Sequence, residues 1–101
     1  MKHTKEIIIA LEDLADELVA LGAITKDEVE NLGFLLFNDY TNDCYKSFSL
    51  DWSEADMEES LVKTRETFPY YLRNIEVSVA ATRFLQKEFP NEDHVLVDVS
   101  W

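Results

Sequence analysis

The sequence predicts an all-α fold, a compact bundle of about five helices in which residues 1–101 form one domain. Three observations support this prediction. Only two glycines and two prolines are present, fewer than a turn-rich β fold would need. Apolar side chains recur every three or four residues along most of the chain, which is the spacing of a buried helix face. Two segments also have the form of a capping box, the pattern that begins many helices.

The first helix is predicted over residues 5–21. Acidic side chains fill the face opposite the apolar one, and Gly22 follows as a natural helix stop. The apolar face would consist of Ile8, Leu11, Leu14, Ala15, Leu18 and Leu21.

The second helix is predicted to begin at the capping box of Thr25 and Glu28 and to run as far as Phe48. Its middle, "NDYTND", has poor helix propensity, so we expect a break or kink near Asn42. Its apolar face would consist of Val29, Leu32, Gly33, Leu36, Phe37, Tyr40, Cys44 and Phe48.

Two further helices are predicted on either side of Pro69. Ser53 and Asp56 form the second capping box. Pro69 ends this third helix and suits the first turn of a fourth helix, about 70–89, which Pro90 stops. The core-facing residues would be Met57, Leu61, Val62, Phe68, Leu72, Ile75, Val79, Thr82, Leu85 and Phe89, with Tyr71, Ser78 and Ala81 beside them.

The closing segment, residues 91–101, has two interpretations. Alternating Val95, Val97 and Val99 favour an extended strand, for which residues 7–9 are the one other β-branched run that could serve as partner. Alternatively, Asn91 could cap a last helix that carries acidic residues in its first turn.

Composition narrows the classes of function. The net charge of −12 argues against direct binding of a nucleic-acid duplex, which needs a face of Lys and Arg. An acidic surface can instead engage a basic partner or imitate nucleic acid. The single cysteine, Cys44, excludes an internal disulfide. No signal peptide and no apolar run of about 20 residues is present, so we expect a cytoplasmic protein that does not enter the membrane.

No recognisable catalytic motif is present in the sequence. The two histidines, His3 and His94, have no metal-ligand spacing, and we expect no metal, no cofactor and no enzymatic activity. The one candidate polar site combines Asp39 and Asp43, beside the apolar stripe of the second predicted helix, with His94. A carboxylate there could accept a hydrogen bond from the neighbouring Tyr40 hydroxyl or from a polar ligand.

The order of segments resembles the PTS-regulation domain (PRD) family, the regulatory modules of sugar-responsive antiterminators and activators. The resemblance rests on "EESLVKTRETFP", "YYLRNIEVSVAATRFLQKEF" and "PNEDHVLVDVSW", which follow one another from Glu58 to Trp101, and more loosely on "FNDY" at residues 37–40. At the positions of the family's phosphorylated histidines this chain has Tyr40 and Ser100. The resemblance therefore implies a degenerate, stand-alone PRD-like module that has lost phosphohistidine control.

The resemblance also implies structural and functional expectations. The closing segment would be helical, with His94 in its first turn, and the module would form a homodimer. Its partners would be phosphotransferase-system proteins or a transcriptional regulator. An alternative from another class, based on the charge of −12, is an acidic inhibitor or nucleic-acid mimic of the phage anti-defence or immunity type.

Overall fold

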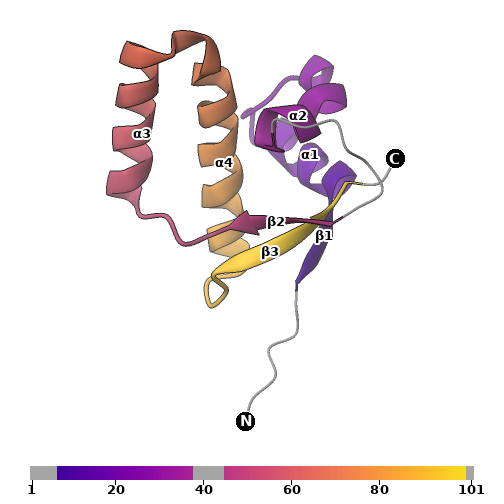
Figure 1. The fold of residues 1–101 in the computed structure, drawn as a ribbon. Helices are drawn as coiled ribbons and strands as arrows, with labels where there is room; N and C mark the ends of the chain where they lie inside the picture. The colour runs from indigo at the N-terminus through magenta and orange to yellow at the C-terminus, as the bar shows by residue number, and fades with distance from the viewer. Residues whose placement is uncertain (1–6, 38–44, 100–101) are drawn as a thin grey trace.

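The computed structural model describes residues 7–37 and 45–99, and it places them in a mixed α/β fold (Figure 1). The described residues form four α-helices, a three-stranded sheet and two short 3₁₀ helices. The predicted all-α bundle is therefore wrong. The elements are β1 (Ile8–Ala10), α1 (Leu11–Ala20), η1 (Lys26–Asn31), α2 (Leu32–Phe37), β2 (Tyr45–Ser49), α3 (Glu54–Thr67), η2 (Pro69–Tyr71), α4 (Leu72–Glu88) and β3 (His94–Asp98).

The sheet has the strand order β1-β3-β2, so the strand that comes last in the sequence lies in the centre. It runs parallel to β1, with Ile9 beside Val97, and antiparallel to β2, with Phe48 beside Val95. The helices lie on one side of the sheet (Figure 1). Val95 and Val97 are fully buried, whereas Leu96 between them is partly exposed, so β3 presents one apolar face to the core.

The expectation of a closing helix is contradicted by β3. Val95 and Val97 alternate with less buried residues, as a half-buried strand requires. The run at residues 7–9 supplies one neighbour, and the Leu96 amide donates to the Ile7 carbonyl at 2.8 Å. The extended interpretation of the local pattern is thus confirmed for residues 94–98, and the helical one taken from the PRD resemblance is wrong.

The two N-terminal helices are also shorter than predicted. The helix expected over residues 5–21 begins only at Leu11, because residues 8–10 pair with β3. The helix expected from Thr25 to Phe48 is divided between η1, α2 and the strand β2. Phe48 is buried as predicted, but it packs from a strand.

The two helices on either side of Pro69 are confirmed. The Ser53 hydroxyl accepts a hydrogen bond from the Asp56 amide at 3.1 Å, so α3 begins at the predicted cap. Pro69 stands at the start of η2, which leads directly into α4. Two predicted core residues of this region, Val62 and Phe68, are instead exposed.

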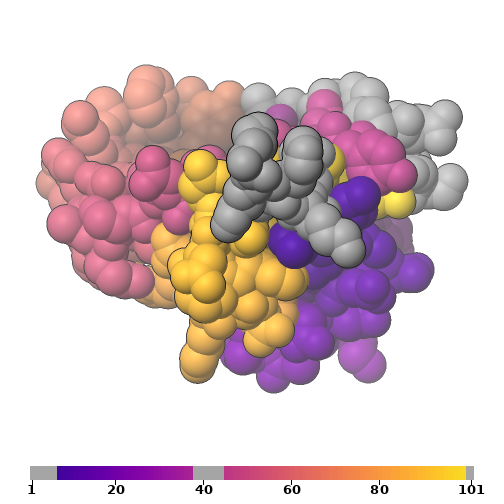
Figure 2. Space-filling model, turned by 90° about the horizontal axis from the view of Figure 1, so that it is seen from below, coloured from indigo at the N-terminus to yellow at the C-terminus, as the bar shows by residue number. Residues whose placement is uncertain are grey.

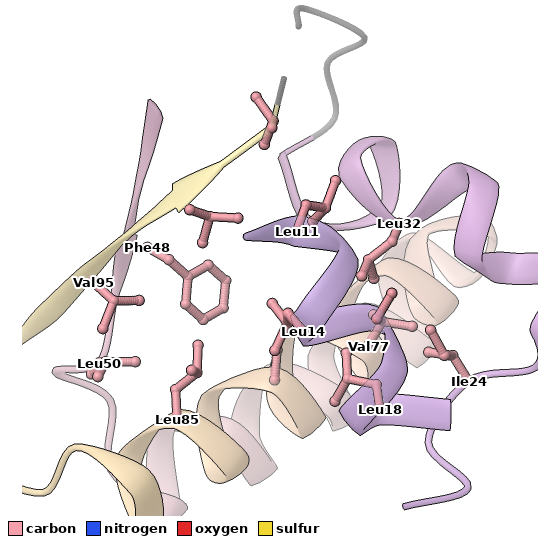
Figure 3. Packing of buried hydrophobic residues seen from close by; sticks show 14 residues of the cluster. Leu11, Leu14, Leu18, Ile24, Leu32, Phe48, Leu50, Val77, Leu85 and Val95 are labelled. Carbon is pink, nitrogen blue, oxygen red and sulfur yellow. The ribbon is translucent and has the colours of Figure 1, made fainter. Parts of the chain in front are cut away.

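The hydrophobic core lies between the sheet and the helices (Figure 3). Leu14 and Leu18 of α1, Val77 and Leu85 of α4 and Val95 of β3 belong to it and are fully buried. The α3–α4 hairpin also has buried residues outside this cluster. Met57 of α3 and Val79 of α4 are buried there.

Candidate functional site

The candidate polar site falls largely outside residues 7–37 and 45–99. Asp39, Tyr40, Asp43 and Ser100 lie outside the described residues. The predicted grouping of Asp39 and Asp43 with His94 therefore stays a prediction.

His94 is described, and it is the first residue of β3 rather than part of a helix. Its side chain is 40% exposed, and its Nδ1 lies 2.8 Å from Asp93 Oδ1. This contact with the imidazole lowers the pKa of the Asp93 carboxyl below its usual value. No group of three His, Cys, Asp or Glu side chains within residues 7–37 and 45–99 could hold a metal ion. His94 thus forms a partly exposed contact with Asp93 at the end of the sheet.

The strongest polar cluster of the described chain is centred on Arg73, which the sequence did not single out. Its guanidinium donates to both carboxylate oxygens of Glu28, at 2.6 and 2.7 Å, and to the Ala23 carbonyl at 2.9 Å. A further bond reaches Glu76 at 3.2 Å. Hydrogen bonds from Arg73 are the main reason why the pKa of Glu28 falls to about 2. Each of the three guanidinium nitrogens donates within the fold, so this cluster joins η1 to α4 and is a structural contact rather than a site for a substrate.

A second set of contacts holds α3 against α4. Arg83 of α4 donates to both carboxylate oxygens of Glu54, at 2.8 and 3.1 Å. The Gln86 amide donates to the Leu50 and Trp52 carbonyls, each at 2.8 Å, and so fixes the connection between β2 and α3. These contacts position the α3–α4 hairpin, whose far end is the first candidate surface.

The hairpin end is the connection between α3 and α4, farthest from the sheet (Figure 1), where Phe68, Tyr70 and Tyr71 are exposed; Val62 of α3 is also exposed. The three aromatic rings contact one another, with centroids 4.9 Å apart for Tyr70 and Tyr71 and 6.5 Å for Phe68 with each tyrosine. Nevertheless Phe68 is 54%, Tyr70 75% and Tyr71 43% exposed. The helical spacing of these residues gave no signal of exposure, because the same spacing is typical of a core face.

A second candidate surface is the acidic groove between α1 and the C-terminal end of α4. Three apolar and four acidic residues line it. The lining residues are Ile9, Asp13, Asp16, Glu17, Phe84, Glu88 and Phe89.

A third candidate surface is a hollow of about 470 Å³, which opens where the parallel strands β1 and β3 end. The carboxyl ends of parallel strands, together with a helix N-terminus such as that of α1, often receive phosphate groups. Here the described lining includes Glu12, Glu30 and Asp98, whose negative charges would repel a phosphate. A nucleotide or phosphate site at this end of the sheet is therefore disfavoured.

Comparison with known proteins adds no relative to this picture. No family model, no curated protein and no solved structure matches the chain. No helix of the described residues is long and apolar enough to cross a membrane. The function is therefore inferred from the surfaces of this chain alone.

Proposed function

We propose that this protein is a non-enzymatic interaction module that binds another copy of itself through the hairpin end. The observation that carries the proposal is the aromatic group of Phe68, Tyr70 and Tyr71, which stays exposed although its rings are already ordered by mutual contact. Exposed apolar groups of this kind mark interaction sites, and tyrosines are frequent among the residues that dominate binding energy.

Charge permits a second copy as the occupant of the hairpin end. The chain as a whole carries −12, so two copies repel each other over most of their surface. Residues 62–71 are different, because they hold two basic side chains (Lys63 and Arg65) and one acidic side chain (Glu66). The hairpin end is thus a place where two copies can meet without bringing their acidic surfaces together.

The experiment is sedimentation velocity of the purified chain from low to high micromolar concentration. We expect a concentration-dependent dimer that Phe68→Ser/Tyr70→Ser converts to a monomer, because both side chains are exposed and the change leaves the core intact. The matched control is Tyr45→Ser, which removes an exposed tyrosine from β2 and should leave the dimer intact. A wild-type chain that stays monomeric, or a double variant that still dimerises, would overturn the proposal.

The link to phosphotransferase-system proteins stays a prediction, and the helical bundle that the resemblance implied with it is absent. Incubation with those proteins and labelled phosphoenolpyruvate tests it directly. Labelling of His94 would contradict the expected loss of phosphohistidine control.

An acidic inhibitor is a second candidate function. Its support is the exposed face of α1, where Glu12, Asp13, Asp16 and Glu17 have no basic partner among the described residues. Such an inhibitor would displace duplex DNA from a basic DNA-binding protein, with an affinity that falls steeply as salt rises. Affinity that persists at high salt would count against this candidate.

A further inference from the structure

The acidic groove is separate from the hairpin end. It lies at the opposite end of α4, where Phe84, Glu88 and Phe89 face Asp13, Asp16 and Glu17 of α1. Figure 2 shows the C-terminal end of α4, in orange, beside α1, in indigo to purple. The hollow between them has a volume of about 330 Å³, which is enough for a long side chain but small for a folded domain.

Two of the three apolar residues that line the groove are aromatic. Phe84, Phe89 and Ile9 are half-buried and pack against the hydrophobic core, so their inner faces are fixed while part of each side chain remains accessible. A fixed aromatic ring attracts a cation placed over its face, and it also offers apolar surface to an alkyl chain.

The charged residues that line the groove are all acidic. Asp13, Asp16, Glu17 and Glu88 line the groove, and none of them forms an ion pair or hydrogen bond with another described side chain. No basic residue belongs to the described lining, and Lys87, next to Glu88 in the sequence, is not part of it. The groove also adjoins the C-terminal end of the 17-residue helix α4, where the peptide dipoles add negative potential.

We propose that the acidic groove binds a basic peptide segment of a partner protein by receiving one Arg or Lys side chain. The alkyl part of that side chain lies on Phe84 and Phe89, and its charged head lies among the four carboxylates. The complementarity of charge selects this occupant, because a phosphate, a nucleic acid or an acidic peptide would be repelled. A bare divalent ion is disfavoured, since these carboxylates do not form a group that could hold a metal.

The experiment is a titration of the ¹⁵N-labelled chain with N-acetyl-arginine amide, the smallest unit of a basic peptide, followed by NMR. We expect saturable shifts confined to the backbone amides of β1, α1 and the last turns of α4. N-acetyl-citrulline amide has nearly the same shape without the charge, and it should produce no saturable shift. Spermidine carries charge without a peptide unit, and we expect it to bind more weakly than a peptide with several arginines.

Two matched variants locate the site. Asp16→Asn/Glu88→Gln removes two groove charges, and we expect binding of the arginine unit to weaken by about fivefold. Asp27→Asn/Glu59→Gln makes the same change in net charge at exposed positions of η1 and α3, outside the groove and the hairpin end, and should leave the affinity unchanged. Phe84→Leu should also weaken binding, because it removes the aromatic face and keeps an apolar side chain.

Three results would overturn this inference. They are shifts spread over the whole acidic surface, equal binding of the citrulline compound, and equal weakening by the two charge variants. Tighter binding of spermidine than of an arginine peptide would replace the peptide partner by a polyamine. None of these results bears on the dimer, which the hairpin-end variants test separately.

Discussion

Replacing Glu28 by glutamine isolates the charge in the Arg73 cluster, because a glutamine oxygen can still accept from the Thr25 amide, now 2.9 Å from the Glu28 carboxylate. The pKa of Glu28 falls from 4.5 to about 2, and at about 1.4 kcal/mol per unit this corresponds to about 3 kcal/mol in favour of the folded carboxylate. Solvent reduces this figure, since Glu28 is 24% and Arg73 41% exposed. We expect Glu28→Gln to lower the free energy of unfolding by about 2 kcal/mol at pH 7, and Tm by about 10 °C.

The direction of the pKa shift determines how the stability contribution of Glu28 changes with pH. The folded-state pKa of Glu28 is lower than the unfolded value, so its contribution is complete above about pH 4.5 and is lost as pH falls towards 2. Urea unfolding of both chains, followed by circular dichroism between pH 7 and pH 2, should show two curves that converge at the acidic end. The control is Glu30→Gln, an exposed acid of the same segment η1. A destabilisation that stays constant down to pH 2, or one that Glu30→Gln reproduces, would refute the assignment to the ion pair.

Three further predictions concern the core and the helix ends. Ser53→Ala removes the cap of α3 and should cost about 1 kcal/mol in urea unfolding, whereas an unchanged midpoint would show that the cap is unimportant. Gly22→Ala should lower the free energy of unfolding by about 1 kcal/mol, because φ is +75° there. The cost does not come from a clash, since the alanine Cβ would have open space around it, and an unchanged stability would contradict this prediction. Met57→Ala should cost about 2–5 kcal/mol and, in hydrogen exchange, should deprotect α3 while the amides around Leu14 keep their protection. Equal deprotection of both regions would contradict a role of Met57 confined to the hairpin.

The parts of the fold that local chemistry determines could be predicted from the sequence. The hydroxyl of Ser53, the ring of Pro69 and the stop at Pro90 act on their immediate neighbours, so the start of α3 and the limits of α4 follow from a few residues each. The strands could not be placed in the same way. The segment at Phe48 shares a helix-like spacing of apolar residues with the chain before it, yet its hydrogen-bonding partners in β3 lie far along the sequence.

For the closing segment, by contrast, the local pattern predicts the correct structure and the family resemblance predicts the wrong one. The segment's alternating valines indicate a strand, which the structure confirms, whereas the resemblance to a helical family favours a helix, which is wrong. For the surfaces, the spacing of apolar residues predicts a core position for Phe68, because periodicity does not reveal where a helix extends beyond its neighbour. The acidic groove depends on how α1 lies against α4, and no single segment carries that information.

The central position of β3 has a consequence for the order in which the protein can be made. A ribosome releases β1 and β2 first, but these strands do not pair with each other in the sheet, and both pair with residues 94–98. The α3–α4 hairpin, whose contacts are local, can form during synthesis, whereas the sheet must wait for its last strand. A chain shortened before His94 would therefore lose the whole sheet and would leave two unpaired strand edges open to aggregation.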